Sequence, residues 1–448
     1  MSSRDETAAS ALRAGAAETT ITPAPGVDLS GYAAREGPSI DVHDDLWCRA
    51  VVLDDGMTRV ALISLDLLGI DFELDAAIRA AVARSARIDP QGILVNCSHT
   101  HAGPAVVNLT GLGLPDPNYV EKLPAWIAET VDRACARLEP AEAGYGEAPV
   151  SVGINRRERT TDGATIIGRN PEGVRDDQVR VLSITHPTGE PIALLFSHAA
   201  HGTTLGGANR AVSSEWMGDA CRRLRDRLGG DAVAVFLQGC CGEISPDHAG
   251  TSFAEVERLG GIMADAVAAA QASSRPVSLA GIGTRLERVG LSLQDPPAAE
   301  AARADLEKRR QELERARAGS ASAYWARALE GQVEYSQWVL GLSERGEKEM
   351  KLPFAVQALA LGEVALVGLS GEVFFELARE IEAASPFPHT MVLGYANGCT
   401  GYVPTAKAVA EGGYEADDSF RWYGTLRLAP GAGGEMVASA VRMLETLG

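Results

Sequence analysis

The sequence predicts an α/β fold in which mixed β-sheet layers are flanked by helices. Three observations favour this class. Apolar strand-like runs alternate with segments of helical periodicity, many short β segments occupy residues 143–184, and 448 residues with 46% hydrophobic content provide a sizeable core. No internal repeat or extended linker divides the chain, so we expect one large domain over residues 1–448 with a helical insertion at about 296–351.

The first third of the chain alternates strands and helices after a glycine-rich loop at residues 31–35. Apolar runs and helical spacing predict, in order, strand 48–53, strand 60–65, helix 74–86, strand 93–95 and helix 119–138. Asp66 ends the second of these strands. An acid in that place either caps a turn or orients a ligating histidine from behind.

The rest of the chain repeats the alternation, with one interruption. The predicted elements are strand 191–196, strand 232–237, strand 354–359, strand 364–369 and helix 374–383. Residues 296–351 are instead rich in Ala, Glu, Arg and Leu and break at Gly319-Ser320, which predicts a two-helix hairpin. Its charge run is typical of a solvated helix face, but the aromatic residues of the returning helix are placed to cover a site: Tyr324, Trp325, Tyr335 and Trp338.

Charge excludes some classes of partner. The formal net charge of −19 repels phosphate backbones and anionic membranes, so we expect neither nucleic acid nor membrane as a partner. The N-terminus carries acids at Asp5 and Glu6 instead of a basic, apolar leader, and no run of about 18 apolar residues occurs. Seven cysteines without paired spacing fit reduced thiols. We therefore expect a cytoplasmic protein.

The motif that organises the chain follows strand 93–95. His99 and His101 stand two positions apart, and Gly103-Pro104 ends the segment. In an extended segment alternate side chains share a face, so both imidazoles would point into one cavity. Imidazole is the commonest nitrogen ligand of zinc, and strand ends are where α/β proteins place chemistry. The alternative is an accidental pair on a half-exposed strand.

Three further clusters lie at strand ends. His198 and His201 follow strand 191–196, and their spacing of three predicts that only one of them is a ligand. Ser245 lies in the loop after strand 232–237, but Pro246 follows it, so this is not a Gly-x-Ser-x-Gly elbow. Glu372 stands at the turn between strand 364–369 and helix 374–383, where an acid serves the helix dipole or a functional site.

Seven ordered motifs together carry a resemblance to a family. The chain resembles the catalytic domain of the neutral ceramidases from about Gly15 to Tyr414. The motifs are Gly15-Ala16-Ala17-Glu18 with Gly31-Tyr32-Ala33, Ser98-His99-Thr100-His101-Ala102-Gly103-Pro104, Ile154-Asn155-Arg156, His201-Gly202-Thr203-Thr204, Gly242-Glu243-Ile244-Ser245-Pro246, Gly371-Glu372, and Gly401-Tyr402-Val403-Pro404-Thr405. That family consists of zinc amidases that hydrolyse the N-acyl bond of ceramide.

The resemblance implies a role for individual residues, carried over position by position. It implies zinc held by four ligands, with His101 and Arg156 facing the substrate and Tyr414 stabilising an oxyanion. Ser245 corresponds to a serine that has been proposed as the nucleophile in the family. The implied zinc ligands are His99, His201, Glu372 and Tyr402.

The expected mechanism is attack of zinc-bound hydroxide on a carbonyl carbon. The metal and Tyr414 would stabilise the tetrahedral oxyanion, and His101 would pass a proton to the leaving group. A serine nucleophile needs an adjacent base, and the sequence shows none beside Ser245, so we expect a structural or substrate-contacting role for Ser245.

Departures from the family shape the expected substrate. No sequence for the immunoglobulin-like C-terminal domain of ceramidases precedes Gly448, and nine Phe and nine Tyr offer little surface for lipid docking. We expect a zinc hydrolase acting on a soluble small or polar amide, lactam, lactone or ester. Two alternatives stay open: a true ceramidase that hydrolyses N-acylsphingosine, and a non-catalytic metal-binding or ligand-binding protein of the same fold.

Overall fold

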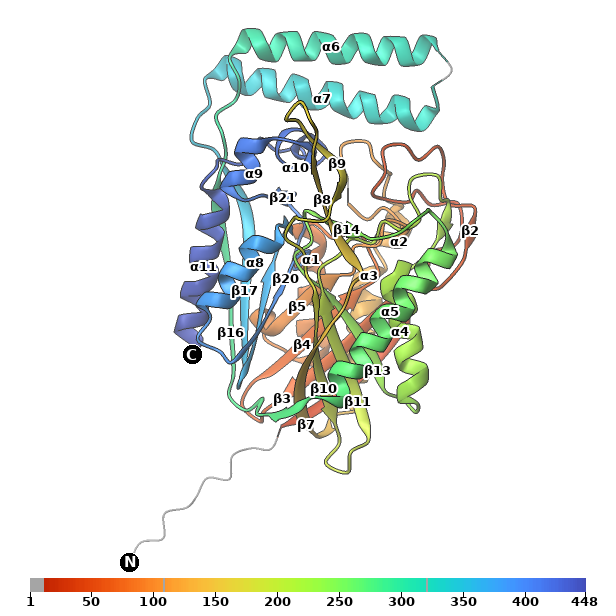
Figure 1. Cartoon of the computed structure of the whole chain (residues 1–448), viewed down its shortest axis with the longest axis vertical. Coiled ribbons are helices and arrows are strands. Elements are labelled where there is room, and N and C mark those ends of the chain that lie inside the picture. Colours follow the sequence, from red (N-terminus) through yellow and green to blue (C-terminus); the bar gives the residue numbers. More distant parts are fainter. Residues whose placement is uncertain (1–11, 108, 320) are drawn as a thin grey trace, which may run out of the picture.

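The structure is a computed structural model that describes residues 12–107, 109–319 and 321–448. Ser320 of the predicted hairpin break and the acidic N-terminal residues lie outside the described residues. Helices lie on the outside of the molecule, and sheets meet at its centre (Figure 1). The predicted mixed α/β class is confirmed.

Three larger sheets make up the centre. Each includes one parallel strand pair, which is β4 with β5, β11 with β13, and β18 with β20. In spatial order the first sheet is β5 (Ile93–Cys97), β4 (Arg59–Leu65), β3 (Trp47–Asp54), β1 (Arg13–Thr20) and β6 (Glu139–Pro140). The second is β13 (Val233–Gln238), β11 (Pro191–His198), β10 (Gln178–Thr185), β7 (Glu142–Pro149) and β15 (Arg275–Val277). The third is β16 (Ile282–Ser292), β17 (Lys351–Leu361), β18 (Val364–Leu369) and β20 (His389–Leu393).

Three smaller sheets lie at one end of the larger ones. They are β14 (Ile244–Pro246), β8 (Gly153–Arg159) and β9 (Thr165–Asn170); β12 (Ala211–Val212) with β2 (Asp41–Val42); and β19 (Glu372–Val373) with β21 (Tyr402–Val403). The helices are α1 (Phe72–Ala86), α2 (Pro117–Val120), α3 (Leu123–Ala136), α4 (Glu215–Leu228), α5 (Phe253–Ala272), α6 (Ala299–Ala318), α7 (Ala323–Arg345), α8 (Phe375–Ala384), α9 (Ala406–Glu411), α10 (Tyr414–Asp417) and α11 (Ala432–Leu447). Short 3-10 turns cover Pro90–Gly92 and Ser419–Arg421. None of the described helices is long and apolar enough to cross a membrane.

Strand alternation explains how two cores form on one sheet. In β4, Val60 and Leu62 point into a core shared by the three large sheets, where they join Leu195 and Leu366. The alternate residues, including Ile63, belong to the core beneath the outer helices. Apolar side chains therefore face both ways, as expected of strands that are covered on both faces.

The predicted hairpin is present as α6 and α7, which lie side by side across the end of the molecule above α9 and α10 (Figure 1). Ser322 begins α7 by accepting a hydrogen bond from the Trp325 amide, and Gly346 ends it in the left-handed conformation. Two hydrogen bonds join α7 to the body, one from the Tyr324 hydroxyl to Asp28 (2.7 Å) and one from the Tyr335 hydroxyl to the Thr425 carbonyl (2.8 Å).

Candidate metal centre

The predicted site residues meet where the parallel strand pairs end. His99 and His101 follow β5, His201 follows β11, and Glu372 follows β18. Single bridges join these ends across the sheets, between Asn96 and Ala396 and between Thr100 and Gly202. The sheets thus bring together residues separated by up to 300 positions in the sequence.

His99 reaches the centre by a route that the sequence did not predict. Strand β5 ends at Cys97, and His99 has a left-handed backbone (φ 61°), so the idea of an extended His-x-His segment is wrong. The His99 ring still faces inward, because its Nδ1–H donates to the Leu68 carbonyl (2.6 Å) and the ring stacks on Tyr395 at 3.9 Å between centroids. Its Nε2 is left for the centre.

His101 lies beside His99 with its Nε2 only 3.1 Å from the Nε2 of His99. Its Nδ1–H donates to the Gly31 carbonyl (3.2 Å). Gly31 has φ 96°, and a Cβ there would lie 2.2 Å from His101 Nδ1, so only glycine permits this approach. The predicted loop at residues 31–35 therefore seats the second imidazole.

Of the two histidines after β11, only His201 joins the cluster. Its Nδ1–H donates to the Ile244 carbonyl (3.0 Å), and its Nε2 points to the centre. The His198 ring is turned away, with Nδ1 at 3.0 Å from the Gln178 carbonyl and 3.4 Å from Asp176. The structure thus places one histidine of this pair in the cluster and the other outside it.

Three imidazoles each aim one ring nitrogen at the same point. One ring nitrogen from each of His99, His101 and His201 lies within 4.8 Å of the others, and no other such group of His, Cys, Asp or Glu occurs in the described part of the chain. Burial lowers the pKa of His201 to about 4, with Arg156 adding to the effect, and burial lowers the pKa of His101 as well. Both rings are therefore neutral at pH 7, and their converging lone pairs call for a cation.

Glu372 supplies a carboxylate to this point. Its Oε2 lies 3.1 Å from His201 Nε2 and 3.4 Å from His99 Nε2. The same atom accepts from the Tyr395 hydroxyl (3.2 Å), and Oε1 accepts from the Tyr423 hydroxyl. Burial opposes the charge, but the adjacent His99 is the main neighbour that outweighs it, and the pKa of Glu372 is held well below its usual range.

Tyr402 is paired directly with Glu372 in the short parallel sheet of β19 and β21. Its hydroxyl lies 3.5 Å from His201 Nε2 and accepts a hydrogen bond from Arg156 (3.0 Å). Tyr414 lies next to it, with ring centroids 5.7 Å apart. Burial raises the pKa of both phenols, so both keep their protons at neutral pH.

Arg156 connects these groups to a buried acid that the sequence analysis missed. Its Nε donates to Glu415 (2.8 Å), while another nitrogen of the guanidinium lies 3.3 Å from His201 Nε2. Arg157 donates to the second oxygen of Glu415 (2.7 Å). Glu415 therefore fixes the guanidinium that contacts Tyr402 and His201.

Ser245 and Asp66 stand apart from this chemistry. Ser245 lies in β14 opposite Ile154, and its hydroxyl forms no hydrogen bond with a described residue, so no base contacts it. Asp66 accepts from Arg49 (2.9 Å) and from the Trp47 amide (3.0 Å). Its role is structural, and the idea that it orients a ligating histidine is wrong, since His99 is oriented by the Leu68 carbonyl instead.

Tyr395 and Tyr423 also went unrecognised in the sequence. Tyr395 lies in the glycine-rich loop 394–405, which is a signal of close backbone approach but not of a particular side chain. Tyr423 has no local signal, because its contact with Glu372 depends on the fold of the segment after α10. Both hydroxyls hold the carboxylate in place.

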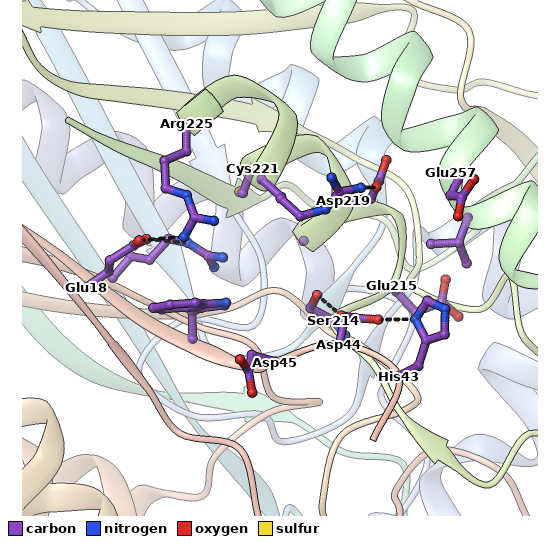
Figure 2. Close-up of a pocket in the computed structure, with 15 residues that line it drawn as sticks. Glu18, His43, Asp44, Asp45, Ser214, Glu215, Asp219, Cys221, Arg225 and Glu257 are labelled. Atoms are coloured by element: carbon purple, nitrogen blue, oxygen red, sulfur yellow. Dashed lines mark hydrogen bonds and ion pairs between the residues drawn. The ribbon is translucent and has the colours of Figure 1, made fainter. Parts of the chain in front are cut away.

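A separate cavity of about 180 Å³ lies between β3 and α4 (Figure 2). It is rich in acids, and several of these already have partners: Glu18 pairs with Arg225 (3.0 Å), and Asp44 pairs with His43 (2.9 Å). The three clustered histidines do not line it. The metal-compatible centre is therefore the histidine cluster and not this acidic cavity.

Both the sequence and the fold are similar to those of known proteins. Residues 12–269, more than half of the chain, match the family model described as neutral/alkaline non-lysosomal ceramidase, N-terminal. Neutral ceramidase B of Dictyostelium discoideum is 25% identical over 251 residues, which are 50% of this chain and 34% of that protein. The match therefore spans about a third of the relative's length.

Two solved structures share the fold. The crystal structure of neutral ceramidase from Pseudomonas aeruginosa matches with a TM-score of 0.74 and 20% identity, covering 98% of this chain and 74% of that chain. A structure described as ceramidase complexed with C2 matches with a TM-score of 0.76 and 19% identity, covering 98% and 75%. At these identities the likeness concerns the fold.

Proposed function

Because the chain belongs to the neutral/alkaline non-lysosomal ceramidase family, as its motifs indicated, we propose that it is a zinc-dependent hydrolase of a C–N amide bond. The observation that carries this proposal is the convergence of imidazole nitrogens on the Glu372 carboxylate in a buried centre. We propose a small or polar substrate, and lactams, lactones and esters present the same carbonyl chemistry.

The donor set fits zinc. Imidazole nitrogens, one carboxylate and one phenol form a borderline site of the kind zinc prefers, and each imidazole Nδ1–H is already held by a backbone carbonyl. We assign the metal to His99, His201, Glu372 and Tyr402, because Glu372 Oε2 contacts His99 and His201 together. When bound, zinc would polarise the substrate carbonyl and supply an activated water.

The chain's own residues would then act on the substrate. Protonated Tyr414 donates a hydrogen bond to the oxyanion that develops at the carbonyl oxygen. Arg156 holds the Tyr402 hydroxyl and keeps its own charge close to the centre. His101, less buried than the other two histidines, is placed to take a proton from the attacking water at its free Nε2 and then pass that proton to the leaving nitrogen.

Metal analysis and turnover test the proposal together. We expect about one zinc per chain in the purified protein, loss of that zinc in the double variant His99→Ala, His201→Ala, and retention in His198→Ala, whose ring is turned away. Zinc should also persist in His101→Ala while hydrolysis falls. Full zinc content in the double variant would refute the metal assignment.

The substrate is tested by comparing detergent-dispersed ceramide with a panel of soluble amides. Faster turnover of the soluble amides supports the proposal, whereas turnover of ceramide at a comparable rate would favour a true ceramidase, the activity named for the relatives. If the protein binds zinc but neither hydrolyses any substrate nor binds a hydroxamate in a zinc-dependent way, the non-catalytic alternative is favoured.

A further inference from the structure

The two oxygens of the Glu372 carboxylate have different neighbours. Oε2 lies 3.1 Å from His201 Nε2 and 3.4 Å from His99 Nε2. Oε1 instead accepts a hydrogen bond from the Tyr423 hydroxyl, and it forms no other hydrogen bond with a described residue. The carboxylate therefore turns one oxygen to the histidine cluster and the other to a phenol.

Tyr423 is held in place by its surroundings. Its ring packs on the backbone of Gly401, which has φ 117°, and a Cβ at that position would lie 3.1 Å from Tyr423 Cγ. The ring also meets the Tyr402 ring edge to face, with 6.3 Å between centroids. The Cys399 Sγ lies 3.9 Å from the Tyr423 hydroxyl oxygen. These contacts keep the hydroxyl against the Glu372 carboxylate.

The way in which Glu372 meets a metal decides what else the metal can bind. A carboxylate can bind a metal ion through one oxygen or through both. A catalytic zinc site keeps one coordination position open for water or substrate, whereas a structural site is closed. If both oxygens of Glu372 turned to the metal, the second oxygen would occupy the open position. The hydrogen bond from Tyr423 opposes this arrangement, because it holds Oε1 on the side of the phenol.

From these contacts we propose that Tyr423 is a positioning residue that limits Glu372 to one metal-binding oxygen and so keeps a coordination position open for water and substrate. This inference rests on the proposed zinc-dependent hydrolysis and on the assignment of Glu372 as a ligand. Loss of the Tyr423 hydroxyl would leave zinc binding intact and weaken the binding of a further ligand to the metal. A hydroxyl that only supported the carboxylate would have the opposite effect, since its loss would weaken zinc binding.

Tyr395 provides a matched control on the other oxygen. Its hydroxyl donates to Glu372 Oε2 (3.2 Å), and its ring stacks on His99. Removal of this hydroxyl leaves the hydrogen bond from Tyr423 to Oε1 in place. Tyr395→Phe should therefore bind zinc less tightly, while the zinc-loaded variant keeps its open position.

The experiment compares Tyr423→Phe and Tyr395→Phe with the wild type. Competition with a chelator measures the zinc affinity, and calorimetry measures the Kd of acetohydroxamate for each zinc-loaded protein. In Tyr423→Phe we expect a zinc affinity at least equal to that of the wild type and a hydroxamate Kd raised about tenfold or more. In Tyr395→Phe we expect weaker zinc binding and a hydroxamate Kd close to the wild-type value.

A hydroxamate Kd that rises no more in Tyr423→Phe than in Tyr395→Phe would overturn the inference, and so would weaker zinc binding by Tyr423→Phe. Either result leaves the proposed function intact. A crystal structure of the zinc-loaded wild type tests the same point without a variant: zinc bonded to Oε2 alone supports the inference, and zinc bonded to both oxygens overturns it. Absence of zinc binding by the wild type would refute the proposed function and this inference with it.

Discussion

Replacing Glu415 by glutamine tests how strongly the buried acid supports the centre. Glu415 accepts from Arg156 through one oxygen and from Arg157 through the other, at 2.8 and 2.7 Å, and all three side chains are less than a tenth exposed. Glutamine keeps one acceptor oxygen but places its NH₂ group, a donor, against a guanidinium that is also a donor. Breaking a buried pair from one side costs about 3 to 5 kcal/mol, because the remaining charge stays buried.

The expected loss in free energy of unfolding corresponds to a shift in melting temperature. An unfolding entropy of about 2.1 cal/mol/K per residue gives roughly 0.9 kcal/mol/K for 448 residues, so Glu415→Gln should lower Tm by about 3 to 5 °C. Urea unfolding at pH 7 gives the free energy directly. The control is Glu344→Gln, which removes an exposed pair with Arg303 and should cost less than about 1 kcal/mol.

The pH dependence of this difference follows from the pKa of Glu415. Burial raises it, but Arg156 and Arg157 outweigh burial and hold the pKa below the ordinary value of 4.5. The carboxylate therefore contributes stability above pH 4.5, and that contribution is lost as the pH falls through the folded-state pKa. The difference in free energy of unfolding between wild type and Glu415→Gln should become smaller in acid. A gap no larger than that of Glu344→Gln at pH 7 would refute the reasoning.

Three further predictions concern the oxyanion donor, a buried acid and the hairpin. Tyr414→Phe should lower kcat by roughly ten- to a thousandfold with zinc content unchanged, as measured by steady-state kinetics and metal analysis. Burial raises the pKa of Glu243 to about 8, so the folded chain keeps a proton that the unfolded chain releases above pH 4.5. The free energy of unfolding should therefore fall as the pH rises between those values. Glu243→Gln should remove up to about 1.4 kcal/mol per pH unit of that slope, as measured by urea titrations. Gly331→Ala places a Cβ 2.3 Å from the Thr110 carbonyl oxygen and should loosen the hairpin in limited proteolysis, whereas Gly341→Ala, on the same helix, meets only the end of a flexible side chain and should not.

Each of these predictions has an outcome that contradicts it. An unchanged kcat would show that Tyr414 does not contact the oxyanion, and a trapped acyl-Ser245 intermediate would replace water by serine as the nucleophile. An unaltered pH slope in the Glu243 variant would mean that the carboxyl is ionised when folded. Equal protease resistance of the two alanine variants would show that the hairpin does not need the close approach at Gly331.

Site residues could be recognised from the sequence pattern only where they directly follow an apolar strand. His99 and His101 were predicted because they come just after an apolar run, and the same pattern pointed to one of His198 and His201. The fold class followed from the alternation of such runs with helices. The left-handed turn at His99 is invisible in that pattern, since it depends on the loop that supplies the Leu68 carbonyl.

Contacts between distant segments explain the rest of what was missed. Glu372 and Tyr402 are thirty positions apart and become neighbours only through a two-residue parallel pairing, and they were identified through family resemblance, not periodicity. Tyr423 and Glu415 touch the site from the C-terminal segment, where no spacing rule connects them to Glu372 or Arg156. Such contacts arise from tertiary packing alone.

The proposed ligands follow strands of three different sheets, and this has a consequence for how the protein folds. His99, His201 and Glu372 come together only after pairings as remote as Asn96 with Ala396 have closed, and such closures are entropically costly and slow. A partly folded chain that lacks the third sheet has no carboxylate to offer the metal. Zinc would bind the native state alone and stabilise it by about 2.7 kcal/mol at a hundredfold excess over Kd. Metal uptake during refolding should therefore coincide with the last long-range step, and bound zinc would then report completed folding.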